Sequence, residues 1–434
     1  MKKILFKNAK IVSHEKIYEG NIIVQNGKII DIEINDVNLL LEGFEIIDLK
    51  GSYVLPGLID SHVHLREPGL AYKEDIFSGT LAALSGGITT ICDMPNTVPP
   101  TDTIKKLIEK DQLFKKKSHV DYFFHFLGTE DNLDQIKKLS KSMVVSVKIF
   151  MAGHHTAKNI VTNQSTIIKI MEILNSKGIP LTVHAEDHSM INYSNESDIE
   201  SYTNSRSPLI AVSAIKKIIQ SCEITGCKVH ILHVSSKKEV ELIRKAKDRG
   251  LPITFEAIPP HLYFNYLDYY KNGNLIKLSP PLRTENDRKF LLNALVNKTI
   301  DTVGSDHAPH TLFEKERLFP DAPPGMPGVQ EMFVILFTLL IEMNVCMEDA
   351  LKLCVYYLGF MPSKIFDIPN KGVISKGYDA DIIVFNPYIE RQGFDELFTK
   401  NKWTPYSKKK IYGEVLKVYL KGINVYEVEK EILK

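Results

Sequence analysis

Eight short apolar runs alternate with stretches of helical spacing over residues 56–365, and this alternation constrains the fold more than any other feature. Stretches such as 74–85 and 208–222 have the apolar spacing of helices. Short buried strands separated by helices are typical of a parallel (β/α)8 barrel, and a doubly wound open sheet is the alternative. The apolar runs read GLIDSHVHL, GITTICDM, VDYFFHFL, MVVSVKIFM, IPLTVHAE, KVHILHVS, LPITFEAI and TIDTVGSD.

The two ends of the chain have a different pattern. In the first 55 residues, Asn26-Gly27 stands between β-branched runs, which predicts a hairpin. Residues 366–434 contain similar β-branched runs punctuated by Gly and Asp. We therefore predict an α/β chain whose (β/α)8 TIM-type barrel spans residues 56–365. Residues 1–55 and 366–434 would together build one small β-sandwich domain.

Composition excludes several classes of protein. With 44% hydrophobic residues, 25% charged residues and a net charge of +1, the chain resembles an ordinary globular protein. This charge gives no reason to expect nucleic acid or a membrane surface as a partner. The longest apolar run, 332–343, is too short to cross a bilayer and predicts a buried helix. The N-terminus lacks the apolar region of a signal peptide, so we expect a cytoplasmic protein.

The chain has five cysteines, and their spacing does not form a CxxC motif. A chain of this length does not need disulfides to fold. We predict that all five are small buried residues in a reducing compartment.

The first apolar run of the barrel carries ionisable residues that share one face. Asp60, His62 and His64 are separated by two residues each, and strand side chains alternate between faces. Two imidazoles on one face can converge on a single metal ion. The alternative is that each histidine bonds to a neighbouring carbonyl.

Lys148 interrupts the apolar run MVVSVKIFM. A buried ammonium is costly unless it is paired or neutralised. A neutral lysine amine can add carbon dioxide, and the resulting carbamate offers two anionic oxygens that can bridge two cations. The alternative is that Lys148 extends to the barrel rim.

Further histidines and one aspartate end the later strands. His184 ends the fifth run. His230 and His233 in the sixth have opposite parity, so only one is expected to face the barrel interior. His233 is nearer the strand end, and His230 is expected to be an ordinary packed histidine. Asp306 ends the eighth run, and His307 and His310 follow it.

These residues together predict a metal centre. They fall at the carboxyl ends of five strands, where a barrel builds its active site. Nitrogen and oxygen donors favour zinc, and their number favours a two-metal hydrolytic centre. The six candidate ligands are His62, His64, Lys148, His184, His233 and Asp306.

Five motifs resemble, in the same order, those of class I dihydroorotases in the cyclic amidohydrolase branch of the amidohydrolase superfamily. They are DSHVHLREPG, YKEDIFSGTLAALSGGITTICDMPNT, HAED, SPPLR and SDHAPH. The resemblance implies zinc-dependent, reversible hydrolysis of L-dihydroorotate to N-carbamoyl-L-aspartate in pyrimidine biosynthesis.

The resemblance also implies a role for each ligand. His62 and His64 would hold the buried zinc, His184 and His233 the exposed one, with carboxylated Lys148 bridging the two ions. Asp306 would complete the first site and act as general base and then general acid.

Arg66 is expected to bind the substrate carboxylate, because a guanidinium matches a carboxylate with two parallel hydrogen bonds. A salt bridge with Glu67 or Glu74 is the alternative. The resemblance adds Asn96 and His310 as further ligands of the carboxylate.

Some positions depart from the family pattern. Ser279, also assigned to the substrate site, stands where many members have Asn, and a serine at this position resembles dihydropyrimidinases and hydantoinases. His261 alone remains of a double-histidine motif. An allantoinase or a dihydropyrimidinase/hydantoinase-type enzyme is therefore an alternative, although their substrates lack the carboxylate that Arg66 would bind. An inactive scaffold partner of aspartate carbamoyltransferase is a further alternative, but all six candidate ligands are present.

Three expectations complete the sequence-based picture. By analogy we expect a homodimer, with possible association with aspartate carbamoyltransferase. The Pro- and Gly-rich loop 321–328 either offers backbone groups to the substrate ring or is a rigid connection. His154 and His155 are expected to face solvent.

Overall fold

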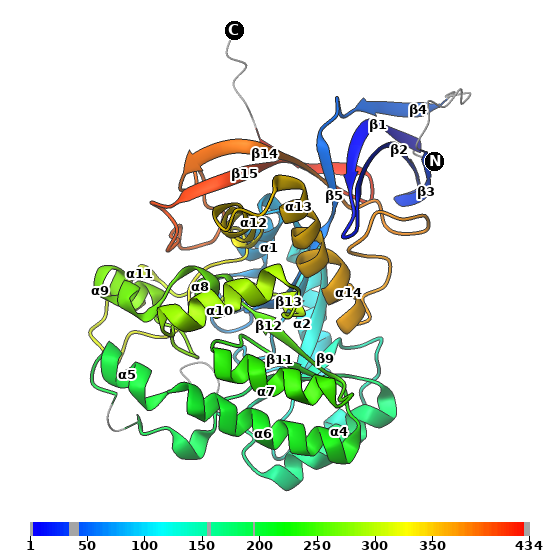
Figure 1. The fold of residues 1–434 in the computed structure, drawn as a ribbon. Coiled ribbons are helices and arrows are strands. Elements are labelled where there is room, and N and C mark those ends of the chain that lie inside the picture. Colours follow the sequence, from blue (N-terminus) through cyan, green and yellow to red (C-terminus); the bar gives the residue numbers. More distant parts are fainter. Residues whose placement is uncertain (1–2, 34–42, 154–157, 194–195, 429–434) are drawn as a thin grey trace.

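The computed structural model describes residues 3–33, 43–153, 158–193 and 196–428. Its centre is a barrel of eight parallel strands, each hydrogen-bonded to the next in chain order (Figure 1). A parallel bridge from Val63 to His307, and a 2.8 Å bond from the backbone N–H of His64 to the carbonyl of His307, join the first strand to the segment after the last. The strands are β6 (Leu58–Val63), β7 (Ile88–Asp93), β8 (Asp121–Leu127), β9 (Ser146–Phe150), β10 (Leu181–His184), β11 (Val229–Ile231), β12 (Ile253–Ala257) and β13 (Thr302–Val303).

Every barrel strand lies within one of the eight apolar runs, so the predicted (β/α)8 barrel is confirmed. The apolar run 332–343 forms the buried helix α12, as predicted. The helices are α1 (Ile76–Ser85), α2 (Ile104–Lys117), α3 (Leu133–Ile136), α4 (Gln164–Lys177), α5 (Ile199–Ser205), α6 (Pro208–Thr225), α7 (Lys237–Asp248), α8 (Pro259–Tyr263), α9 (Tyr269–Asn272), α10 (Glu285–Val296), α11 (Leu312–Lys315), α12 (Met332–Glu342), α13 (Met347–Val355) and α14 (Met361–Ile365), with short helical turns at η1 (His188–Met190), η3 (Tyr266–Asp268), η4 (Gly273–Ile276) and η5 (Tyr356–Phe360).

Local sequence fixes where the helices begin and end. Asp75, Thr103 and Ser236 cap the first turns of α1, α2 and α7 with side-chain oxygens that accept from backbone N–H groups. Gly178 and Gly226 end α4 and α6 with φ values of 63° and 66°. These left-handed conformations suit glycine, so each helix stops before the next buried strand.

Both chain ends contribute to a second, mixed sheet. Strand β5 from the N-terminal part pairs antiparallel with β14 from the C-terminal part, so the predicted composite domain is confirmed. The order is β16-β15-β14-β5-β1-β2-β3, with β4 also paired to β1. The strands are β1 (Lys3–Val12), β2 (Ile17–Gln25), β3 (Lys28–Glu33), β4 (Phe44–Asp48), β5 (Tyr53–Pro56), β14 (Ile382–Gln392), β15 (Lys410–Leu420) and β16 (Ile423–Glu427).

This sheet encloses its own apolar core. The rings of Phe6 on β1 and Tyr419 on β15 lie 4.9 Å apart, although two other strands separate β1 from β15 in the sheet. The strands therefore form one curled sheet around a sandwich-like core. Asn26 and Gly27 form the predicted hairpin turn between β2 and β3, with φ values of 52° and 77°. The domain limits at 55/56 and 365/366 stay a prediction.

The terminal sheet is attached to the barrel by apolar contacts and by an ion-pair cluster. Phe385 on β14 packs against Phe333 and Phe337 on α12, with ring centroids 4.6 and 5.3 Å apart. The ammonium of Lys371 lies 2.6 Å from a carboxylate oxygen of Asp381 and also binds Asp121 at the start of β8.

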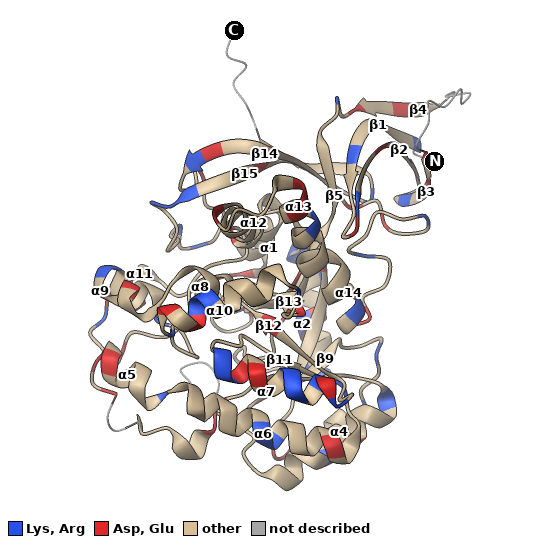
Figure 2. Cartoon of the chain, in the orientation of Figure 1, with Lys and Arg blue, Asp and Glu red and all other residues tan. Residues whose placement is uncertain are grey.

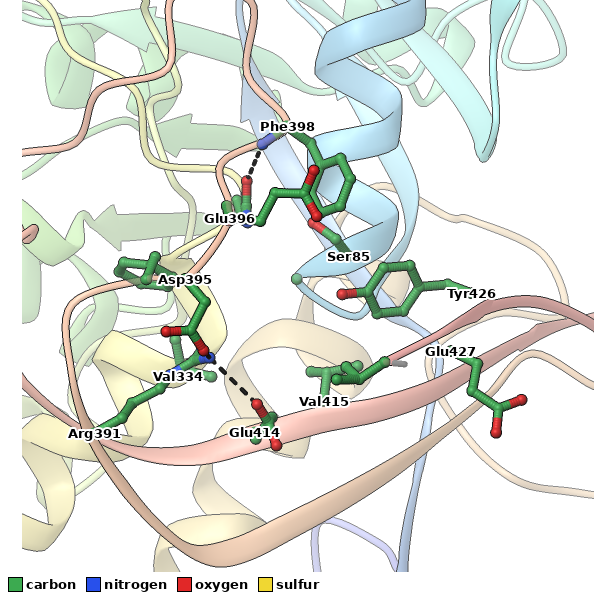
Figure 3. A pocket seen from close by; sticks show the side chains of 14 residues that line it. Ser85, Val334, Arg391, Asp395, Glu396, Phe398, Glu414, Val415, Tyr426 and Glu427 are labelled. Atoms are coloured by element: carbon green, nitrogen blue, oxygen red, sulfur yellow. Dashed lines mark hydrogen bonds and ion pairs between the residues drawn. The ribbon is translucent and has the colours of Figure 1, made fainter. Parts of the chain in front are cut away.

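A cavity of about 460 Å³ lies between the terminal sheet and the barrel (Figure 3). Arg391 and Glu414 form an ion pair along its floor, at 3.3 Å. On its barrel side, the Gln330 side chain donates to the carbonyl of Glu396 and accepts from the N–H of Phe398. These bonds fix the start of the segment 393–409, which links β14 to β15 and continues along the barrel rim.

Replacing Phe385 with alanine is expected to destabilise the protein by about 3–5 kcal/mol, because it empties a fully buried site between the sheet and α12. Tyr388, on the same strand but 72% exposed, is the matched control, and Tyr388→Ala should cost less than about 1 kcal/mol. Urea unfolding of both variants measures the difference. Equal midpoints would mean that the sheet does not depend on this contact.

The surface and the cysteines bear on two further expectations. Basic and acidic residues both occur along α7 (Figure 2). Among the described residues, no helix has both the length and the apolar content needed to span a membrane.

Four cysteines are buried, but Cys346 is exposed, so the prediction for that residue was wrong. It occupies the N-cap of α13, where its thiol lies 3.0 Å from Asp349.

Candidate functional site

A pocket at the carboxyl ends of the barrel strands brings together nine of the ten predicted site residues. The inner space is narrow, about 30 Å³, which is room for about one water molecule. It adjoins a wider outer cavity of about 570 Å³ that shares Asn96 and Phe150 with it. The predicted residues that line the inner pocket are His62, His64, Arg66, Asn96, Lys148, His184, His233, Ser279 and Asp306.

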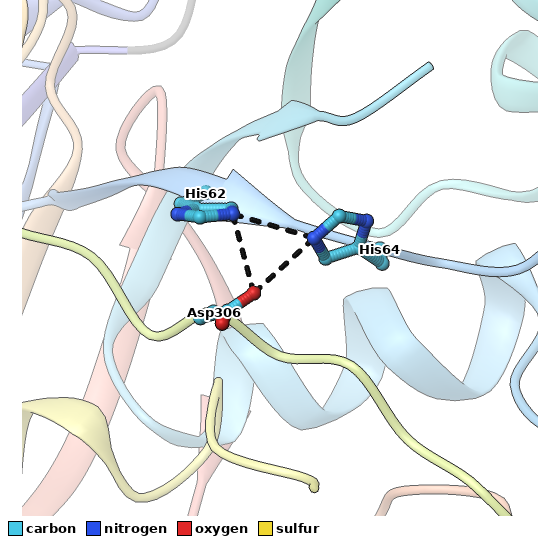
Figure 4. A group of neighbouring side chains, drawn as sticks. All are labelled: His62, His64 and Asp306. Carbon is cyan, nitrogen blue, oxygen red and sulfur yellow. Dashed lines mark hydrogen bonds and ion pairs between the residues drawn. The ribbon is translucent and has the colours of Figure 1, made fainter. Parts of the chain in front are cut away.

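His62, His64 and Asp306 form one donor group (Figure 4). The two Nε2 atoms lie 3.3 Å apart, and Oδ1 of Asp306 lies 3.2 Å from each of them. Donors held tetrahedrally at roughly 2.1 Å from one zinc ion are about 3.4 Å apart. The spacing of these three atoms therefore fits a shared metal ion.

Hydrogen bonds from neighbouring side chains orient the imidazole rings of His62 and His64. Nδ1 of His62 lies 2.7 Å from a carboxylate oxygen of Glu256, and Nδ1 of His64 lies 2.6 Å from the amide oxygen of Asn96. Both partners are acceptors, so each Nδ1 carries the proton and each Nε2 keeps its lone pair for a metal. Burial lowers the pKa of His62 to about 4, which keeps the ring in the neutral form that metal binding requires.

His184 and His233 form a second pair beside the first. Nδ1 of His184 lies 2.9 Å from Nε2 of His233. Glu186 accepts from the other nitrogen of His184 at 2.9 Å and is itself held by Arg206 at 3.1 Å and by the hydroxyl of Ser279 at 3.0 Å. The bond to Glu186 places the ring proton of His184 on Nε2 and leaves the lone pair of Nδ1 on the side of His233. A histidine that binds a metal is oriented by a carboxylate in the same way.

Lys148 lies on β9 and lines the same pocket as the two donor groups. It is 1% exposed, so its head does not extend to the barrel rim. Its ammonium lies 4.6 Å from the ring centre of Phe150. Burial lowers the pKa of Lys148 to about 7, and the nearby Asp306 and Glu256 carboxylates oppose this shift. A large share of the amine is therefore uncharged near neutral pH.

Arg66 lines the same pocket as the donor groups. It is 2% exposed, its Nε donates to the carbonyl of Pro309 at 3.3 Å, and its Nη2 lies 3.4 Å from Nε2 of His310. The two carboxylates named as alternative partners bind elsewhere: Glu67 to Lys117, and Glu74 at 3.4 Å from the ring of His307. Burial lowers the pKa of Arg66 to about 10, so the guanidinium stays charged.

Three site residues have left-handed backbone conformations. Arg66, His233 and Asp306 have φ values of 49°, 39° and 47°. Such values are uncommon outside glycine and concentrate at functional sites, where the surrounding structure compensates for the strain. Each of these residues follows the end of its strand, so the change of backbone direction turns its side chain into the pocket.

The parity argument about the sixth strand was wrong. Strand β11 ends at Ile231, and the left-handed backbone of His233 breaks the alternation beyond it. His230 is in register with Thr182, which is in register with Lys148, so it also faces the barrel interior. His230 is an ordinary packed histidine as expected, since its ring lies 2.8 Å from the hydroxyl of Thr254.

Other expectations have mixed outcomes. Asn96 and Ser279 line the pocket, but the Asn96 side chain binds the candidate ligand His64, and Ser279 binds Glu186, the carboxylate that orients His184. Pro324 and Gly325 of the loop 321–328 line the pocket, and their carbonyls accept from His310 and Lys315. His154 and His155 lie outside the described residues.

Sequence reasoning missed the two carboxylates that orient the rings. Glu186 stands two residues after His184, and Glu256 lies within the apolar run LPITFEAI. An acidic residue in a fully buried strand was the signal, because such a charge needs a partner.

Comparison with known proteins assigns the family. The model of the amidohydrolase family matches residues 53–425. Relatives named dihydroorotase include those of Methanosphaera stadtmanae, 34% identical over 100% of this chain and 98% of the relative, and of Pyrococcus horikoshii, 36% identical over 98% and 92%.

Solved structures agree. An L-hydantoinase (dihydropyrimidinase) from Arthrobacter aurescens superposes with a TM-score of 0.92 at 27% identity and covers 100% of this chain and 98% of its own. A D-hydantoinase superposes with a TM-score of 0.88 at 30% identity, covering 98% and 95%. The family model, the full-length relatives, the barrel fold and the metal donor groups agree. The chain belongs to the amidohydrolase family and is a hydrolase.

Proposed function

We propose that the chain is a zinc-dependent dihydroorotase, which reversibly hydrolyses the cyclic amide of L-dihydroorotate to N-carbamoyl-L-aspartate. The observation that carries this proposal is the placement of a buried guanidinium, Arg66, beside His310 and on the same pocket as the metal donor groups. Dihydroorotate carries a carboxylate next to its reactive ring, and this pocket offers donors for both parts. The names of the full-length relatives support the same substrate.

The donor set fits two divalent cations. His62, His64 and Asp306 would hold one, and His184 and His233 the other. When bound, such ions lower the pKa of water and polarise a carbonyl, which is the chemistry that amide hydrolysis requires.

Lys148 is proposed to carry a carbamate that bridges the two ions. The nitrogen lone pair of the uncharged amine forms an N–C bond to carbon dioxide, one C=O electron pair moves to oxygen, and the nitrogen releases a proton to water. The pKa of about 7 and the place of Lys148 in the same pocket as both donor groups support this modification. It would also replace a buried positive charge with the negative charge that two cations need.

The protein's own groups then have separate tasks. Asp306 would accept the proton of the attacking water at a carboxylate oxygen and return it to the ring nitrogen as the C–N bond breaks. Arg66 and His310 would hold the substrate carboxylate and so fix which face of the ring meets the metal donors. In ring closure the same groups act in reverse.

The proposal predicts metal-dependent turnover of one substrate. Zinc-loaded protein should hydrolyse L-dihydroorotate, and chelation should lower the rate at least about 100-fold until zinc is returned. Dihydrouracil and allantoin, tested in parallel, should react far more slowly because they lack the carboxylate. Metal content measured on the same samples separates loss of zinc from loss of structure.

A hydantoinase- or dihydropyrimidinase-type activity is the second candidate. The solved structures with those names and the presence of Ser279 before the PPLR motif favour it. Turnover of dihydrouracil without turnover of dihydroorotate would select it. Bound metal without turnover of any of the three substrates would instead indicate an inactive relative.

The expected surroundings of the enzyme remain proposals. They are a cytoplasmic location, a homodimer, and association with aspartate carbamoyltransferase, which would supply N-carbamoyl-L-aspartate directly to this site.

A further inference from the structure

The ring of His310 is bonded on both sides, and the two bonds require the same tautomer. Its Nδ1 lies 2.9 Å from the ammonium of Lys73, which can only donate a hydrogen bond, so Nδ1 accepts. Its Nε2 lies 3.1 Å from the carbonyl oxygen of Pro324, which can only accept. The ring proton is therefore on Nε2.

A doubly protonated ring does not fit this site. It would place an Nδ1–H against the ammonium of Lys73. Burial also lowers the pKa of His310 well below its usual value, and the Arg66 and Lys73 cations add to this effect although Glu314 opposes it. His310 is thus a neutral donor with one N–H. The Pro324 carbonyl accepts this N–H in the structure, and a bound carboxylate, as the stronger anionic acceptor, would have to take it over.

This N–H stands beside the guanidinium of Arg66. Nε2 of His310 and Nη2 of Arg66 lie 3.4 Å apart, and both are donors. Two neighbouring donors cannot satisfy each other, but they can share one carboxylate. The opposite tautomer would turn a lone pair toward that carboxylate and repel it.

Lys73 is itself fixed by helix α11. It is 3% exposed, and its ammonium lies 2.8 Å from Oε1 of Glu314. The other oxygen of Glu314 accepts from the N–H and the hydroxyl of Thr311, both at 3.1 Å, in a capping box. The ammonium is therefore held between this carboxylate and the imidazole.

The segment 393–409 holds the backbone of the same two residues. The indole N–H of Trp403 donates to the carbonyl of His310 at 2.9 Å, and the side-chain amide of Asn401 donates to the carbonyl of Lys73. The position of the imidazole against the ammonium is thus set from both sides.

We propose that Lys73 is a positioning residue for carboxylate recognition. It fixes His310 as the Nε2–H tautomer, so that the ring and Arg66 present adjacent donors to the substrate. This inference rests on the proposed function for its substrate, while the tautomer itself follows from the contacts of Lys73 and Pro324.

Steady-state kinetics with dihydroorotate test the proposal. Lys73→Met should raise KM about 10- to 100-fold, because one donor to a charged group is lost, and should change kcat less than about 3-fold. Lys73→Arg, which keeps a donor for Nδ1, should recover most of the lost affinity. Lys106→Met removes a partly buried lysine of α2 that pairs with Asp102, away from His310, and should behave as wild type.

The tautomer is measured separately by long-range ¹H–¹⁵N correlation in protein labelled at histidine, with the His310 signals assigned by their loss in His310→Gln. Wild type should show a proton-free Nδ1, and Lys73→Met a mixture of tautomers. Unchanged KM, an unchanged ring, or a parallel fall in kcat and thermal stability would overturn the proposal. If wild type does not hydrolyse dihydroorotate, the proposed function fails, and the spectra alone decide whether Lys73 sets the ring.

Discussion

Asp306→Asn is expected to lower kcat for dihydroorotate at least about 1,000-fold. The substitution keeps the shape of the side chain but removes the only negative charge of the donor group around His62 and His64. It also removes the group proposed to take a proton from water and return it to nitrogen, a task worth about 10² to 10⁴ in rate. The measurement is kcat at saturating substrate in zinc-loaded protein.

Metal content tells which role of Asp306 has been lost. Full zinc occupancy with a collapsed kcat would assign proton transfer, whereas loss of one ion per chain would assign ligation. Asp367→Asn is the matched control, since Asp367 is half-exposed and pairs with Lys141 on the surface. A variant at Asp306 with more than a tenth of the wild-type kcat would contradict both roles.

Arg66→Ala should lower kcat/KM for dihydroorotate about 100- to 10,000-fold. The guanidinium is buried and would meet the substrate carboxylate with two charge-assisted bonds, each worth about 1.5–3 kcal/mol. Arg66→Lys keeps the charge without the planar fork, so an intermediate loss is expected. Neither substitution adds backbone strain, because Ala and Lys have the same difficulty as Arg at a φ of 49°.

Dihydrouracil distinguishes a specificity role from a general one. It has no carboxylate, so whatever slow turnover wild type gives should be unchanged in Arg66→Ala. A loss that is equal for both substrates would mean that Arg66 supports the site structurally, and the case for dihydroorotate would weaken. A variant that still hydrolyses dihydroorotate normally would remove the observation on which the proposed function rests.

The barrel and its donor residues could be predicted from the sequence because both depend on local patterns. A strand buried on two faces is almost wholly apolar, so His62, Lys148 and His184 stood out against their runs. A parallel barrel brings the carboxyl ends of all its strands together at one face. The convergence of these residues could therefore be expected.

What could not be predicted depends on contacts between distant parts of the chain. The orientation of His62 requires Glu256 from another strand, 194 residues away. The inward direction of His233 depends on a left-handed backbone that alternation cannot represent. Lys73 resembles a surface residue in sequence, and only its burial against Glu314 and His310 reveals a role.

The pairing of β5 with β14 has a consequence for how the molecule is made. When β5 leaves the ribosome, its partner strand has not been synthesised, and nearly the whole barrel must follow first. Until then the hydrogen-bonding edge of β5 is open to other chains, and such edges are sites of aggregation. Contacts this far apart in sequence also slow folding. Completion of the terminal sheet is therefore a late step of biogenesis, and the segment 393–409, which holds His310 and Lys73 in place, reaches the rim of the barrel only at that step.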